Sequence, residues 1–143
     1  MPNPLTPPDP QSLTLARQGW VGLACWMTLG FLLETLMAYK TPAYLNDPVR
    51  RELFRLAHTH GTLLNLLLIL ASLWSTRSAL PLRRSTSLAF RFGSVLMPLG
   101  FLLAGVRHFE SDPGFAIWLV PPGALLVLFA TISLAVRQPS TKP

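Results

Sequence analysis

Four ionisable side chains stand out because they fall within or beside apolar stretches of the chain: Glu34, His58, His60 and His108. A neutral imidazole is a good ligand for haem iron, zinc or copper. A carboxylate can bind a metal ion directly or orient a neighbouring imidazole. Ionisable groups are costly inside a membrane and usually have a partner or a function there. These four residues therefore form the candidate site.

Two kinds of binding chemistry fit this set. In the first, His58 and His108 are ligands of a haem b, and Arg55 and Arg107 pair with its propionates. In the second, His58, His60, His108 and Glu34 hold a zinc or copper ion. Either would suit a small protein of membrane redox chemistry and electron transfer. No GxSxG, P-loop or HExxH motif occurs, so the catalytic residues stay unknown and enzymatic activity stays open.

A structural role explains the same residues without a ligand. Glu34 can pair with an arginine or a histidine, and a histidine at a helix C-terminus suits the helix dipole, as His108 would. The protein would then be a non-catalytic accessory or scaffold subunit of a membrane complex, and the polar cluster would be a structural network.

The elements that must position these residues are four apolar runs, each close to the 20 or so residues that cross a hydrocarbon core. Half of the 143 residues are hydrophobic and 13% are charged, against about a quarter charged in an average soluble domain. The runs predict an all-α integral membrane protein, an antiparallel up-down bundle of four transmembrane helices. We expect helices over about 17–39, 50–76, 86–109 and 115–137, within one domain at 15–137. Residues 1–14 are expected to be a disordered, proline-rich tail, and 138–143 a second tail.

Such a bundle brings the candidate residues to one side of the membrane. Glu34 lies near the end of the first run, His58 and His60 near the start of the second, and His108 at the end of the third. At about 100° per residue, His58 shares a helix face with Asn65, whereas His60 lies about 200° away. We therefore expect His58 to face the bundle interior and His60 to face another helix, a lipid or a second subunit.

Charge predicts the orientation, because cytoplasmic loops carry an excess of Lys and Arg. The side with both termini has seven basic residues and one acid, and the other side has five of each. Both termini are thus expected in the cytoplasm, with the candidate site on the outer face of a bacterial inner or plasma membrane. The expected partners are the lipid bilayer, other membrane subunits or a second copy. The dispersed basic residues exclude a nucleic-acid binder.

Overall fold

The computed structural model of the protein describes residues 9–78, 81–110 and 112–137. Its elements are α1 (Pro10–Ala38), α2 (Pro42–Leu45), α3 (Pro48–Ser78), α4 (Arg84–Val106), the 3-10 helix η1 (Phe115–Leu119) and α5 (Val120–Ala135). With η1 and α5 taken as one segment, four helices are long and apolar enough to cross a membrane. The prediction of a helical protein with four long apolar helices is therefore confirmed.

The first helix begins earlier than the sequence predicted. Asp9 caps α1 by accepting a hydrogen bond from the amide of Gln11, and Pro10 occupies the first turn. Proline suits that position because its missing N–H would have had no helical partner. The expectation of a disordered tail over residues 1–14 is thus wrong for 10–14, while 1–8 lie outside the described residues, as do 138–143.

Two other helix boundaries also differ from the expected ones. Helix α4 ends at Val106, and Arg107 is already extended, with φ −126° and ψ 96°. The last segment starts as η1, and its α-helix begins only at Val120, with proline in the first turn. Pro121 and Pro122 cannot donate backbone hydrogen bonds, so they fit a helix start better than a helix interior.

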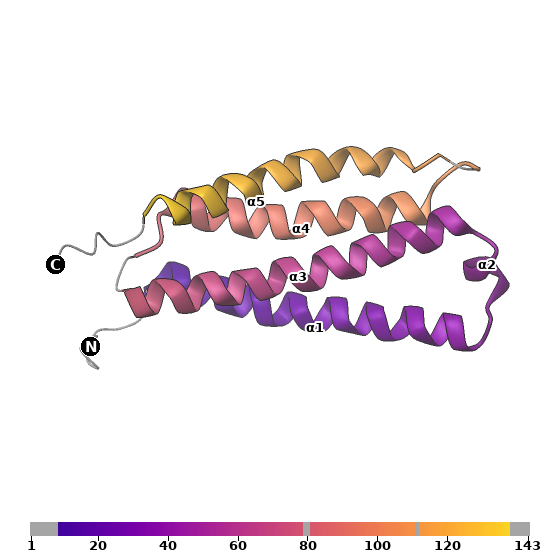
Figure 1. Cartoon of the computed structure of the whole chain (residues 1–143), viewed down its shortest axis with the longest axis horizontal. Helices are drawn as coiled ribbons and strands as arrows, with labels where there is room; N and C mark the ends of the chain where they lie inside the picture. Colours follow the sequence, from indigo (N-terminus) through magenta and orange to yellow (C-terminus); the bar gives the residue numbers. More distant parts are fainter. Residues whose placement is uncertain (1–8, 79–80, 111, 138–143) are drawn as a thin grey trace.

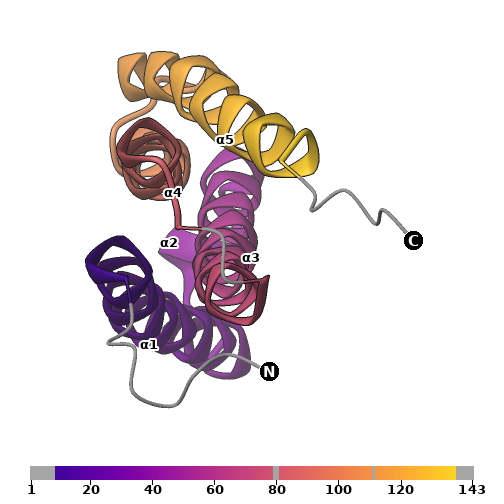
Figure 2. The ribbon, with the colours of Figure 1, turned by 90° about the vertical axis from the view of Figure 1, so that its left-hand side faces the viewer.

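The long helices lie side by side, and α3 is central because it packs against both α1 and α4 (Figures 1 and 2). Helix α4 also packs against α5 and η1, whereas the contact between α1 and α4 is small. The start of α1, the end of α3, the start of α4 and the end of α5 lie at one end of the molecule, here called the terminal end (Figure 1). Helix α2 and residues 107–110 lie at the other end, here called the α2 end.

Glycines let α1 and α3 approach closely. The side chain of Asn65 lies against Gly22, the His58 ring lies against Gly30, and the Trp26 ring covers Gly61. A Cβ atom at any of these three glycines would overlap the side chain opposite. Small residues at helix interfaces are typical of membrane proteins, where packing replaces the hydrophobic effect as the main attraction between helices.

The apolar core sits at the terminal end. It comprises seven buried residues from α1, α3, α4, α5 and the segment before α4: Leu15, Leu68, Ala71, Leu82, Ala89, Phe90 and Ala130. Two polar contacts fix the same end. The Leu82 amide donates to Asp9 Oδ2 at 3.2 Å, and Ser72 Oγ donates to the Ser12 carbonyl at 2.7 Å. The start of α1 is thereby tied to α3 and to the start of the α4 hairpin.

The contact between α4 and α5 leaves no room for a larger side chain at Gly123. A Cβ at Gly123 would lie 2.7 Å from the backbone nitrogen of Met97, and a backbone atom cannot move aside as a side chain can. We expect Gly123→Leu to lower the free energy of unfolding in detergent by about 1–3 kcal/mol, the usual cost of overpacking. The control is Phe129→Leu, because Phe129 is half exposed. Equal thermal midpoints for the two variants would contradict this packing.

Candidate functional site

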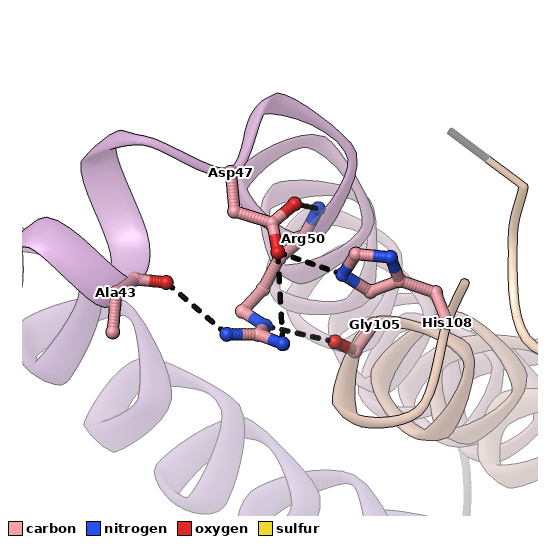
Figure 3. Close-up of polar contacts among 5 residues, drawn as sticks. All are labelled: Ala43, Asp47, Arg50, Gly105 and His108. Carbon is pink, nitrogen blue, oxygen red and sulfur yellow. Dashed lines mark hydrogen bonds and ion pairs between the residues drawn. The ribbon is translucent and has the colours of Figure 1, made fainter. Parts of the chain in front are cut away.

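The α2 end is held by one carboxylate, that of Asp47, which directly precedes α3. Its Oδ1 accepts a hydrogen bond from the Arg50 amide at 2.9 Å, and its Oδ2 accepts one from His108 Nε2 at 2.8 Å (Figure 3). The Arg50 guanidinium lies 3.6 Å from the same Oδ2. It also donates to the carbonyls of Gly105 and Ala43, at 3.2 and 3.1 Å. These five residues, the Asp47 cluster, join the α2 segment, α3 and the end of α4.

The protein environment favours the charged form of Asp47. Burial alone would raise the pKa of this carboxyl. The hydrogen bond from the Arg50 amide, the hydrogen bond from His108 and the electrostatic attraction of both residues oppose burial and hold the pKa below its usual value of 3.8. The His108 side chain is only 6% exposed, and its Nδ1 is buried without a hydrogen-bond partner among the described residues. His108 is therefore a buried residue that connects the end of α4 to Asp47 through the hydrogen bond from its Nε2.

His58 lies on the other side of α3, against α1. Its Nδ1 is 2.8 Å from the carbonyl oxygen of Trp26. A carbonyl can only accept a hydrogen bond, so Nδ1 carries the proton in this contact and Nε2 of the neutral ring keeps its lone pair. The ring is also fixed against Gly30. A histidine with one nitrogen donating to a carbonyl and the other free has the arrangement of a metal or haem ligand.

A groove of about 610 Å³ opens beside His58, which forms part of its wall. Its ten lining residues come from α1, α2 and α3: Met27, Gly30, Phe31, Leu33, Glu34, Met37, Ala38, Tyr44, Arg55 and His58. This surface is called the His58 groove below. Its size lies within the range of about 300–1,000 Å³ that is usual for small-molecule sites.

The two charged residues of the His58 groove have different surroundings. Arg55 lies 3.6 Å from Glu52, and both side chains are more than half exposed. Glu34 is exposed, and within the described ranges it forms no hydrogen bond or ion pair. The groove therefore combines an apolar wall with an imidazole, a guanidinium and a carboxylate.

His60 faces α4, as the helical phase predicted for a residue turned away from His58. Its Nδ1 donates to the Leu56 carbonyl one turn earlier, at 2.8 Å. Its ring lies 5.1 Å from that of Phe101, centroid to centroid, at an angle of 31°. His60 is thus a packing residue between α3 and α4.

The structure brings together some of the predicted site residues and separates others. Glu34, Arg55 and His58 line one groove, whereas His60 and His108 do not line it. Arg107 is the exposed C-cap of α4. Over the part of the chain that is described, no three His, Cys, Asp or Glu side chains form a group that could hold a metal ion. The predicted four-ligand metal set is not assembled, because His60 points to α4 and His108 is bound to Asp47.

Two hydrogen-bond partners of these histidines were not predicted from the sequence. Asp47 directly precedes Pro48, and an Asp before a Pro is a sequence signal for a helix start. That signal explains its bond to the Arg50 amide but carries no information about His108, which lies 61 residues further along. The partner of His58 is a backbone carbonyl of α1, and no residue type marks a carbonyl in advance.

Comparison with known proteins adds no functional assignment. No family model matches the chain, and neither the curated proteins nor the solved structures give a significant match.

The Asp47 cluster yields a prediction about stability and pH. In Asp47→Asn, the amide can still cap α3, but it loses the charge that holds His108 and Arg50. We expect the free energy of unfolding to fall by about 1–3 kcal/mol, the range for hydrogen bonds to charged groups. Because folding lowers the pKa of Asp47 from its usual value of 3.8, its contribution is present above that value and is lost as pH falls through the lower folded value.

The measurement is the thermal midpoint in detergent between pH 6 and pH 3. The difference between wild type and Asp47→Asn should shrink at the acid end. Glu52→Gln is the matched control, since it removes an exposed carboxylate whose pair with Arg55 is worth at most about 1 kcal/mol. A difference that stays constant with pH would show that the Asp47 charge does not stabilise the fold.

Proposed function

We propose that the four long helices cross a membrane as an antiparallel up-down bundle. Helix α1 has 29 residues, about 43 Å at 1.5 Å per residue, which exceeds a hydrocarbon core of about 30 Å. Many large apolar side chains are exposed on the outside, among them Phe31 at 76% and Trp118 at 69%. A lipid environment accounts for this surface better than water does. The basic excess at the terminal end supports a cytoplasmic location for both termini.

Within that membrane protein, we propose that the His58 groove binds haem b for electron transfer. The observation that carries the proposal is the state of His58: Nδ1 donates to the Trp26 carbonyl, and the ring with its remaining lone pair lies at the wall of a 610 Å³ groove. His58 would be an axial ligand of the iron. Arg55 would pair with a propionate, which is a common use of arginine.

The shape of the groove favours a flat, extended ligand over a single metal ion. Its α1 residues run from Met27 to Ala38, about 16 Å along the helix axis. Ligands of one ion must all lie within about 2.3 Å of it, so Met27 and Met37, at opposite ends of this wall, cannot share one. The groove also contains two thioethers, Met27 and Met37. Methionine is an established partner of histidine in haem ligation.

The second candidate function is that of a non-catalytic accessory or scaffold subunit in a membrane complex. The Asp47 cluster favours it, because its hydrogen bonds and ion pairs tie three segments of the α2 end together without any ligand. In that case the polar residues serve the fold and the exposed helices contact a partner. The two functions differ in whether the purified protein carries a chromophore.

The test is an ultraviolet–visible spectrum of the protein extracted gently from its membrane. Haem b predicts a Soret band that shifts on reduction. In His58→Ala the band should be lost or reduced at least about tenfold in occupancy, since the axial bond is gone. His60→Ala should retain it, because His60 packs against Phe101 and its own helix. The factor of ten corresponds to about 1.4 kcal/mol of binding free energy.

The possible results of this test distinguish haem binding at His58 from the role of an accessory subunit. A Soret band that survives in His58→Ala but disappears in His108→Ala would contradict the assignment of His58. A wild-type protein that is colourless after mild extraction, and that takes up no added haemin, would leave the accessory subunit as the function. Co-purification with another membrane protein would then be the positive sign.

A further inference from the structure

An arginine inside α4 is the starting point for a second binding site. Arg91 Nε donates to Gln18 Oε1 on α1 at 2.8 Å. In return, Gln18 Nε2 donates to the Arg91 carbonyl at 2.9 Å and lies 3.3 Å from Ser94 Oγ. The guanidinium is thus fixed by a neutral amide. Among the described residues no carboxylate forms an ion pair with it. The terminal nitrogens of Arg91 remain available for an anion.

The position of Arg91 along the helix sets the depth of that charge. It lies seven residues after the start of α4 at Arg84, about 10 Å along the axis from the terminal end. In a helix the Cα–Cβ bond tilts toward the N-terminus, which for α4 is the terminal end. A long arginine side chain at this depth therefore reaches back toward the headgroup region, as snorkelling residues do.

Arg91 and Gln18 border an apolar groove of about 470 Å³ between α1 and α4. The groove exists because α1 and α4 make only a small direct contact, as both pack on α3. Its wall is mainly hydrophobic and includes Val21, Leu88, Val95 and Leu99. Cys25, the only cysteine of the chain, also lies on it. This surface is called the Arg91 groove below.

We propose that the Arg91 groove binds an anionic phospholipid. The phosphate of the headgroup pairs with the guanidinium of Arg91, and one acyl chain lies along the apolar wall toward Leu99. Charge complementarity favours a lipid with net negative charge over a zwitterionic one, because the positive charge of Arg91 is not neutralised by the protein. The proposal rests on the membrane placement proposed above and is independent of haem binding at the His58 groove.

The first experiment counts bound lipids by native mass spectrometry. The full-length protein is reconstituted into nanodiscs of phosphatidylglycerol and phosphatidylcholine in equal amounts and released into detergent. We expect about one phosphatidylglycerol to be retained, with at least about a fivefold preference over phosphatidylcholine. Arg91→Gln should remove the preference, since the anion loses its charged partner. Arg84→Gln is the matched control, because it removes one exposed arginine from the same helix and the same end.

The second experiment locates the lipid, using Cys25 as a natural reporter. The rate at which a maleimide alkylates Cys25 is measured in micelles doped with either lipid. Phosphatidylglycerol should slow the reaction at least threefold in the wild type and in Arg84→Gln, but not in Arg91→Gln. Inorganic phosphate alone should give no protection, because it has no chain to cover the wall. Val95→Trp, which fills the groove and keeps Arg91, should also abolish the lipid effect.

Specific results would overturn the proposal. Equal retention of the two lipids by the wild type would do so, as would identical behaviour of Arg91→Gln and Arg84→Gln. If Arg91→Gln does not fold, Val95→Trp is the deciding variant. If phosphatidylglycerol still protects Cys25 from alkylation in Val95→Trp, this groove is not the lipid site. A protein that does not fractionate with membranes at all would instead contradict the membrane placement itself.

Discussion

The close contact between α1 and α3 is the constraint on which the rest of the structure depends. Three glycines, Gly22, Gly30 and Gly61, each leave room for a large side chain from the opposite helix. The contact brings the Trp26 carbonyl within reach of His58 and thereby fixes the state of that ring. Because α1 is held on α3, it has little contact with α4. One interface thus positions the His58 groove at the α2 end and leaves the Arg91 groove between α1 and α4.

Charged side chains have different partners at the two ends of the molecule. At the α2 end, Asp47 is matched by Arg50 and His108, and Glu52 by Arg55. At the terminal end, the one described acid is Asp9, and it accepts hydrogen bonds from the amides of Gln11 and Leu82 rather than pairing with a basic residue. Among the described residues no carboxylate forms an ion pair with the basic residues there, Arg91 included. The same asymmetry that predicts the orientation in a membrane also supports the proposed pairing of Arg91 with an anionic headgroup.

The sequence alone predicted the features that depend on composition and on helical periodicity. The apolar lengths predicted four long helices, and the phase of about 100° per residue separated His58 from His60. It was insufficient where a contact joins distant residues. Nothing in the neighbourhood of His108 indicates that Asp47, 61 residues away, would accept a hydrogen bond from its Nε2. The start of α1 was readable in principle, since Asp9 and Pro10 form a helix-start signal, but the high proline content of the preceding residues obscured it.

The hydrogen bonds of the three histidines distinguish their roles more clearly than their positions in the sequence do. In each ring one nitrogen is committed to an oxygen: Nδ1 of His58 and of His60 to a carbonyl, and Nε2 of His108 to a carboxylate. The question is therefore where the second nitrogen lies. In His108 it is Nδ1, which is buried without a partner. The His60 ring packs against Phe101. Only His58, among the three, lies on the wall of a groove large enough for a cofactor. A histidine ligand needs an accessible lone pair and usually has its other nitrogen fixed by a hydrogen bond, and His58, between α1 and α3, combines the two.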